Sequence, residues 1–272
     1  MRLVAEITAK KFKQRRDDIV GENHIVKKVA EYIWEKAQDF ELKFAQQTIR
    51  SDDDWNRWWY EKFERYSILE NRYFYNVLEV GCGPHTNIKY ILPKIKFDKL
   101  WLEDPLIQYY ITYNLSKSKS FCDYLRGKVK KNKINYLLEI FSDLNIKIDL
   151  STSKLEDLPY KDYQMDLVVC IKVLDHVNDY DKCMNEIFRV LNKDGLLILG
   201  QDLSNKDDLR QCPESYADIG HPIKVDHIVI EQTLKGKYHK RFEKILSRTE
   251  GRNPSAHFGT YLGILEKLSE QS

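Results

Sequence analysis

The run from Asn76 to Thr86 contains the residues whose types and spacing carry the most chemical information. An apolar segment that includes the acid Glu79 predicts a strand, and Gly81 and Gly83 follow it one residue apart. Residues 86–92 can then form a helix. Glycines in such a turn allow strained dihedral angles and let a ligand approach the main chain next to a helix N-terminus. The pattern predicts a strand, a tight ligand-binding turn and a helix.

The type of ligand depends on the residues around the two glycines. A dinucleotide site requires a third glycine, and Thr86 stands at that position. Glu79 would repel a pyrophosphate but suits an ammonium group, so a ligand with an amino-acid end fits better. Its carboxylate would meet the helix amides, and S-adenosylmethionine is a ligand of this kind. The alternative is an ordinary strand–turn–helix, because one glycine pair is a weak signal.

A second carboxylate follows at the spacing that a nucleoside site needs. Residues 100–106 predict a buried strand that ends in Glu103, Asp104 and Pro105. The separation of Asp104 from Gly81 is close to the roughly 20 residues expected for an acid that accepts the ribose hydroxyls. Capping of a helix that begins at Pro105 is the alternative, and both roles can hold. Asp104 is favoured over Glu103 because it directly precedes that helix.

Strands and helices alternate through the rest of the chain. A helix is predicted over about residues 181–191 and another from Asp226 to Leu234. The further strands are predicted at 146–150, 165–171, 196–200, 238–246 and 258–265. This alternation predicts an α/β fold with a doubly wound, mostly parallel, seven-stranded sheet, and its ligands bind beyond the carboxyl ends of the strands.

Five motifs in this order resemble the class I S-adenosylmethionine-dependent methyltransferases over roughly residues 75–201. They are Glu79-Val80-Gly81-Cys82-Gly83, Asp104-Pro105-Leu106, Leu155-Glu156-Asp157-Leu158-Pro159, Val173-Leu174-Asp175-His176-Val177 and the helix and turn from Glu186 to Gly195. The resemblance implies a Rossmann-like methyltransferase fold and S-adenosylmethionine as the cofactor.

The resemblance also implies which residues bind the cofactor. They are Glu79, Gly81, Cys82, Gly83, Asp104, Pro105, Leu106, Leu155, Glu156, Asp157, Ile171 and Lys172. Lys172 departs from the family, because many relatives carry a small or amide residue there. A lysine beside a sulfonium is electrostatically unfavourable, so its ammonium is expected to point toward substrate or solvent.

Composition agrees with an enzyme that acts on small molecules. The 272 residues are 32% charged, yet the net charge is only +2, which favours neither a nucleic-acid nor a membrane partner. No apolar run approaches the ~18 residues of a membrane span, and the N-terminus lacks an apolar signal core. Five cysteines in predicted core, turn and loop positions suggest reduced thiols and a cytoplasmic location.

Two segments are predicted to be additions to a methyltransferase domain at residues 75–272. Residues 1–74 form an N-terminal helical extension rich in aromatics, including Trp58, Trp59 and Phe63. It either packs on the sheet or covers the active site as a lid. The basic run 10–16 is expected to be a solvated helix face. A helical insertion at about 109–145 is expected to form a homodimer contact or a wall of the substrate cleft.

His221 and His176 are the candidate catalytic residues. If the acceptor is a hydroxyl, its proton must leave, and histidine is the natural base near neutral pH. His221 is the first choice because a glycine–proline turn presents it, with Asp218 and Asp226 available to orient its ring. His176 is second, and His85 is expected to shape the glycine turn. His221, His227 and Asp226 as metal ligands are a weaker alternative, so no metal is predicted.

The function that follows is methylation of a small-molecule hydroxyl, such as that of a sugar, a surface-polysaccharide precursor or a specialised metabolite. A nucleic-acid or protein methyltransferase is the first alternative, but the chain lacks an Asn-Pro-Pro-Tyr motif and a concentrated basic stripe. A non-catalytic S-adenosylmethionine-binding protein is the second. The acceptor is not specified, because substrate contacts lie in loops added to the scaffold.

Overall fold

The structure is a computed structural model that describes residues 25–47, 54–110, 148–205, 219–252 and 259–269. Several predicted features therefore lie outside the described residues. They are the basic run 10–16, nearly all of the insertion at about 109–145, Asp218, Cys122 and Cys212.

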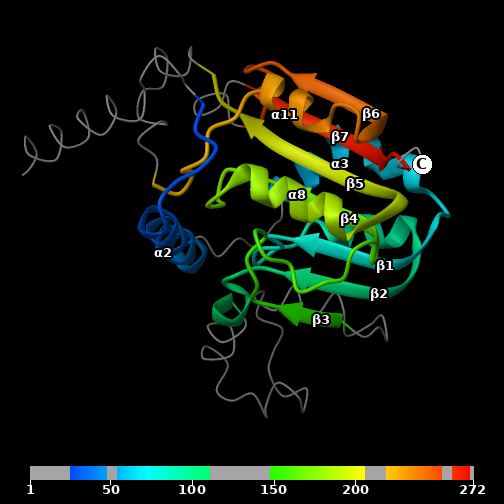
Figure 1. Ribbon diagram of the computed structural model, residues 1–272, viewed down its shortest axis with the longest axis horizontal. Coiled ribbons are helices and arrows are strands. Elements are labelled where there is room, and N and C mark those ends of the chain that lie inside the picture. The colour runs from blue at the N-terminus through cyan, green and yellow to red at the C-terminus, as the bar shows by residue number, and fades with distance from the viewer. Residues whose placement is uncertain (1–24, 48–53, 111–147, 206–218, 253–258, 270–272) are drawn as a thin grey trace, which may run out of the picture.

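A seven-stranded sheet forms the centre of the molecule (Figure 1). Its strands are β1 (Tyr73–Val80), β2 (Lys96–Glu103), β3 (Ile148–Ser151), β4 (Met165–Ile171), β5 (Leu191–Leu203), β6 (Tyr238–Leu246) and β7 (Gly259–Lys267). The order is β3-β2-β1-β4-β5-β7-β6, with β1 to β5 parallel and β7 antiparallel to both of its neighbours. The predicted fold class is confirmed.

The central strands read as continuous apolar runs because both of their faces are covered. In β4, every residue except Asp166 is buried. The last nine residues of β5 are all buried. Such runs are typical of parallel strands between two helical layers. The flanking apolar side chains form two clusters, one on each face of the sheet.

Helices α8 (Tyr180–Val190) and α11 (His227–Leu234) cover one face of the sheet (Figure 1). Each begins at an aspartate, because the side chain of Asp179 accepts from the Lys182 amide and that of Asp226 from the Val229 amide. These caps satisfy amides that have no partner inside the helix. No helix in the described ranges combines the length and apolarity that a membrane crossing requires.

The other face is covered by α3 (Asp54–Lys62), the 3₁₀ helix η1 (Glu64–Leu69), the short α4 (Ile88–Ile91) and the 3₁₀ helix η2 (Leu92–Lys94). Trp59, Phe63 and Tyr66 are buried there, and Trp59 contacts the sheet where Gly200 leaves room for its ring. The aromatic residues of this part of the extension therefore pack on the sheet, as the first of the two alternatives predicts.

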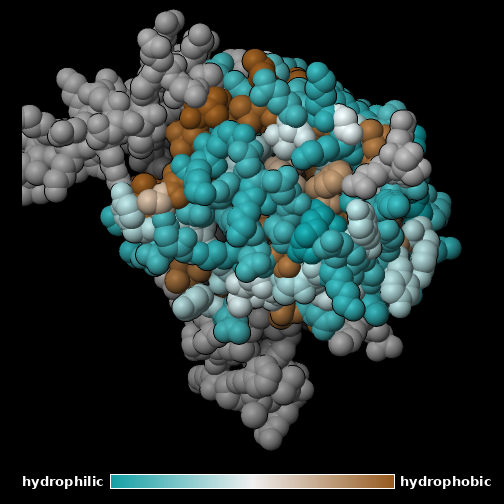
Figure 2. Space-filling view, viewed as in Figure 1, coloured by the Kyte–Doolittle hydropathy of each residue, from teal (hydrophilic) through white to brown (hydrophobic). Residues whose placement is uncertain are grey.

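Helix α2 (Glu31–Gln47) lies at the end of the sheet where the parallel strands finish (Figure 1). The segment before it is attached to the core on two sides. Val26 exchanges both main-chain hydrogen bonds with Lys224, and Val29 donates to the Asn178 carbonyl. The face covered by α8 is mostly hydrophilic, and its apolar side chains gather toward the end where α2 lies (Figure 2).

The boundaries of several elements differ from the predictions, and those of one helix and one strand show why. The helix predicted over residues 86–92 is reduced to α4, a single turn that continues as η2 around Pro93. Strand β5 begins at Leu191 rather than 196, because Leu191 already pairs with Met165 of β4, and a register irregularity separates this pair from the next one, Leu167 with Leu196.

Gly81 gives the first testable prediction. Its φ is +58°, and an added Cβ would lie 2.5 Å from Val173 Cγ2. Gly236 has a φ of +73° and no atom within 4 Å of an added Cβ. We expect Gly236→Ala to lower the free energy of unfolding by about 1–2 kcal/mol from backbone strain alone. Gly81→Ala should cost a further 1–3 kcal/mol or so, from crowding.

Chemical denaturation of both variants measures the difference. Equal losses for Gly81→Ala and Gly236→Ala would contradict the close packing of the turn on Val173.

Candidate functional site

A cavity of about 450 Å³ lies at the carboxyl edge of the sheet. Most of the predicted site residues line it: Gly81, Gly83, Asp104, Pro105, Leu106, Leu155, Glu156, Lys172, His176 and His221. Glu79, Cys82, Asp157 and Ile171 are not among its lining residues. Glu103, the less favoured of the two acids in the sequence, also lines it, and the lining residues that the sequence did not single out include Arg252 and several side chains of α2, among them Trp34, Phe40 and Glu41.

The glycine turn is fastened to the end of β2. Gly81 and Gly83 both adopt positive φ, at +58° and +57°, which side chains disfavour. The Cys82 amide donates to the Glu103 carbonyl at 3.1 Å, and the Gly83 amide donates to Asp104 Oδ2 at 2.9 Å. The turn therefore keeps one shape against the neighbouring strand.

The N-terminal extension holds the far end of the same turn. Asn56 of α3 donates through Nδ2 to the carbonyls of His85 and Thr86, at 2.9 and 2.8 Å. The main chain of His85 thus helps to shape the turn, in line with the expectation for that residue.

Glu79 caps α4 in this structure. Its side chain is 1% exposed and accepts hydrogen bonds from the Thr86 hydroxyl and from the amides of Asn87 at 2.7 Å and Ile88 at 3.4 Å. Desolvation raises its pKa to about 7 although these donors lower it. The amides expected to meet a ligand carboxylate are already bound by Glu79, so binding of the ligand ammonium by this residue stays a prediction.

Asp104 is bound by the main chain on both of its oxygens. Oδ2 accepts from Gly83, and Oδ1 accepts from the Leu106 amide at 2.8 Å, which makes Asp104 the cap that the alternative interpretation expects. Desolvation raises its pKa, and the two amides oppose that shift. It still lines the cavity, so its predicted contact with ribose stays a prediction.

Glu103 is the carboxylate whose oxygens are available. Its side chain lines the cavity and is 1% exposed, and neither oxygen has a hydrogen-bond partner of normal geometry among the described residues. Desolvation raises its pKa to about 9, and the nearby Tyr160 hydroxyl lowers it only in part. A buried acceptor without a donor is costly, so this geometry favours Glu103 over Asp104 as an acceptor for ligand hydroxyls.

Cys82 has the role of a small turn residue. The side chain is buried, and burial raises the pKa of its thiol well above the usual value, so the thiol stays protonated and unreactive. Ile171 is buried at the end of β4, whereas Asp157 is exposed. The predicted cofactor contacts of these three residues remain predictions.

Glu156 joins the cavity wall to the start of α8. Its Oε1 accepts from the amides of Asn178 at 2.6 Å and Asp179 at 3.0 Å. Leu155 beside it is buried and supplies an apolar part of the wall. The segment predicted as the third cofactor motif therefore lies on the cavity with its acid bound to the main chain.

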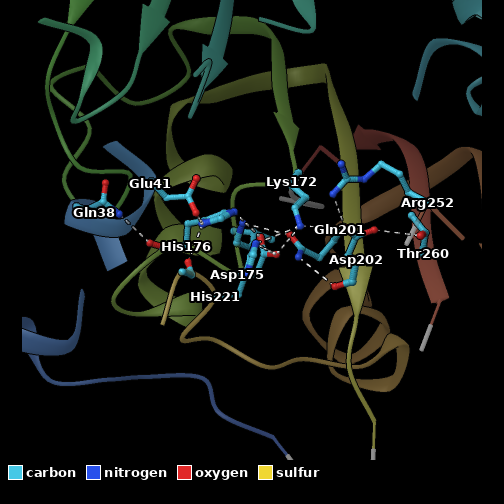
Figure 3. A network of polar contacts seen from close by, with 12 residues as sticks. Gln38, Glu41, Lys172, Asp175, His176, Gln201, Asp202, His221, Arg252 and Thr260 are labelled. Carbon is cyan, nitrogen blue, oxygen red and sulfur yellow. Dashed lines mark hydrogen bonds and ion pairs between the residues drawn. The ribbon is translucent and has the colours of Figure 1, made fainter. Parts of the chain in front are cut away.

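Lys172 lies inside a network of polar side chains (Figure 3). Its Nζ is 3.0 Å from Asp202 Oδ2, 3.4 Å from Asp175 Oδ2 and 3.3 Å from His221 Nε2. Its φ of +59° is unusual for a residue with a side chain. The ammonium points toward protein carboxylates at the edge of the cavity, which differs from the expectation that it faces substrate or solvent.

Asp202, in strand β5, connects this network to two further side chains. Its Oδ2 accepts from Arg252 Nη2 at 3.0 Å, and its Oδ1 accepts from the Thr260 hydroxyl at 3.1 Å. Paired buried charges of this kind hold their geometry, because removing one partner would leave the other uncompensated.

The rings of His176 and His221 lie side by side in the wall of the cavity, with centroids 4.5 Å apart (Figure 3). His176 Nδ1 donates to the Gly220 carbonyl at 2.8 Å and lies 3.6 Å from Glu41 Oε1. Gln38 Nε2 also donates to the His176 carbonyl at 3.3 Å. Both predicted catalytic histidines are therefore brought together, and α2 contributes polar contacts that the sequence did not reveal.

Among the described residues, Asp175 is a carboxylate close to His221, at 3.9 Å from Nε2. Asp226 caps α11 instead. Among the described residues, the group with metal-ligand spacing is Glu41, His176 and His221, so the alternative ligand set with His227 and Asp226 is not assembled.

Comparison with known proteins identifies a domain within this chain. Residues 78–199 match the family model described as a methyltransferase domain. An uncharacterized protein of Methanocaldococcus jannaschii is 35% identical over 151 residues, which are 54% of this chain and 50% of that protein. The chain thus matches about half the length of this curated relative.

Solved structures share the fold. The N-methyltransferase NodS of Bradyrhizobium japonicum, in complex with S-adenosyl-L-homocysteine, is 14% identical with a TM-score of 0.53, over 84% of this chain and 99% of that chain. The YcgJ protein of Bacillus subtilis is 13% identical with a TM-score of 0.52, over 77% of this chain and 98% of that chain. On the family match together with this fold, residues 78–199 belong to a methyltransferase domain.

Proposed function

We propose that the protein transfers a methyl group from S-adenosylmethionine to a hydroxyl oxygen of a small molecule. One observation carries this proposal: a single cavity joins a wall suited to a nucleoside with a wall of polar acid–base groups. Gly83 and Glu103 belong to the first wall, and His176 and His221 belong to the second.

The first wall fits the cofactor. Glu103 offers two buried oxygens that need donors, and the two hydroxyls of a ribose are donors of the right kind. At Gly83 an added Cβ would meet no atom within 4 Å, so a ligand can approach the main chain there. Leu106 and Leu155 supply apolar surface for an adenine ring. The bound cofactor supplies a methyl group already activated on a sulfonium.

The second wall fits a small acceptor. The cavity volume of about 450 Å³ lies in the range of about 300–1,000 Å³ typical of small-molecule sites. Trp34, Phe40 and Phe44 of α2 line it from the side opposite the sheet. A wall of this kind can orient a small acceptor, which is most of what methyl transfer requires of a protein.

The histidine pair is the part of the cavity that can handle the acceptor proton. His221 stays the first candidate, and His176 the second, with its Nδ1 bound to the Gly220 carbonyl and its lone pair on Nε2. The Lys172 ammonium, however, faces His221 Nε2 at 3.3 Å and uses the lone pair that a base needs. Direct base catalysis by His221 would require Lys172 to turn fully toward Asp202 and Asp175.

Glu103 gives a prediction about pH. Its pKa of about 9 in the free protein should fall when ribose hydroxyls donate to the carboxylate, so cofactor binding releases a proton. Affinity for S-adenosylhomocysteine should therefore rise by up to about tenfold per pH unit between pH 6.5 and 8.5 and level off above the free pKa. Glu103→Gln should weaken binding and lose most of this dependence, as measured by titration calorimetry.

Asp104→Asn is the matched control for that experiment. It loosens the turn by weakening the contacts of Gly83 and Leu106, so it should lower affinity yet keep the pH dependence. Titration of the ligand itself affects both variants equally. If Asp104→Asn flattens the profile and Glu103→Gln does not, Asp104 is the ribose acceptor.

His221→Ala tests the second wall. We expect it to retain affinity for S-adenosylhomocysteine and to slow methyl transfer by about 100-fold or more, because the group that handles the acceptor proton is lost. Activity is measured with a panel of hydroxylated small molecules and product detection by mass spectrometry.

His227→Ala is the control for this variant, since His227 lies in α11 and does not line the cavity. Full activity of His221→Ala on an accepted substrate would remove this residue from the reaction. Methylation of amines alone would contradict transfer to oxygen.

A further inference from the structure

Three side chains from distant parts of the chain bring ligand atoms together at the edge of the cavity. Glu41 comes from α2, His176 from the loop after β4 and His221 from the loop before α11 (Figure 3). One atom of each lies within 4.8 Å of the others. Small side-chain adjustments would bring these atoms to the spacing of three ligands on one ion.

We propose that Glu41, His176 and His221 bind a divalent ion of a first-row transition metal. Two imidazole nitrogens and one carboxylate oxygen form a ligand set that suits zinc, iron or cobalt, whereas magnesium prefers oxygen ligands and water. Three protein ligands also leave coordination positions open for an oxygen from outside the protein.

The surroundings of His176 support this assignment. Its Nδ1 donates to the Gly220 carbonyl at 2.8 Å, so the neutral ring keeps its lone pair on Nε2. A ligating histidine almost always makes such an outer contact, because it fixes the tautomer and the ring orientation.

The charged groups around His176 and His221 also favour binding of a cation. Glu41 Oε1 lies 3.6 Å from His176 Nδ1. On the other side, the Asp175 carboxylate lies 3.6 Å from His176 Nε2 and 3.9 Å from His221 Nε2. Lys172 is the cation in contact with His221 in this structure, so that imidazole already serves as an acceptor toward positive charge.

Lys172 does not prevent metal binding, because it has other partners. Its Nζ is closer to Asp202, at 3.0 Å, than to His221. An ion bound by His221 can displace the ammonium toward Asp202 while both carboxylates near the histidines remain to offset the charge of the ion.

The ion would join the extension to the methyltransferase core, since Glu41 belongs to α2 and both histidines belong to the core. Its role in catalysis rests on the proposed function: a hydroxyl bound at an open position loses its proton more easily. Binding of the ion itself does not depend on that function.

The experiment is a titration of metal-free full-length protein, without an affinity tag, with Co²⁺. Visible absorption reports cobalt bound by nitrogen and oxygen ligands, and Zn²⁺ and Mg²⁺ serve as competitors. We expect one equivalent of Co²⁺, displaced by Zn²⁺ and not by Mg²⁺. His176→Ala and His221→Ala should weaken binding by about 100-fold or more, and Glu41→Gln by about tenfold or more.

His227→Ala is the control and should bind Co²⁺ like the unaltered protein, because His227 is not one of the three ligands. Retained binding of S-adenosylhomocysteine shows that each variant is folded. Absence of Co²⁺ binding in the unaltered protein, or binding in His176→Ala and His221→Ala as tight as in the unaltered protein, would overturn the proposal. Methyl transfer that persists without metal would leave the proposed function standing and remove the ion from it.

Discussion

The connection between the glycine turn and the end of β2 is the constraint on which the rest of the site depends. The Cys82 and Gly83 amides donate to the carbonyl of Glu103 and the carboxylate of Asp104, so two strand ends are fixed to each other. Gly81 in turn packs so closely on Val173 that the loop after β4 is held against the same turn. Three neighbouring strand ends therefore form one wall of the cavity, and the hydrogen bonds of the turn amides hold that wall together.

Three buried carboxylates of this wall differ in how many hydrogen-bond donors the protein gives them. Glu79 has several donors, and its pKa rises only to about 7. Asp104 has two amide donors. Glu103 has no hydrogen-bond donor of normal geometry among the described residues, and its pKa rises to about 9. The folded protein bears the desolvation cost of Glu103 without compensation, and a ligand that donates to it recovers part of that cost.

The sequence predicted the central strands well because they are apolar on both faces. The ranges predicted for β4 and β6 agree with the structure, and α8 is displaced by one residue. The sequence could not tell which of Glu103 and Asp104 is bound by the main chain: the helix start that made Asp104 attractive is the feature that occupies it. It could not find Glu41 either, because only the docking of α2 brings that residue to His176.

Helices α2 and α3 contact the core in different ways, although both belong to the extension. Helix α3 is part of the core, through Trp59 and through the contacts of Asn56 with the glycine turn. Helix α2 is attached through the segment before it, which pairs with Lys224 in the chain that follows His221, and through side-chain contacts such as that of Gln38 with His176. These attachments link the position of Glu41 to the position of the loop that carries His221. Because the nucleoside wall is fixed independently at β1 and β2, a change in α2 can alter the acceptor side of the cavity while the cofactor side stays intact.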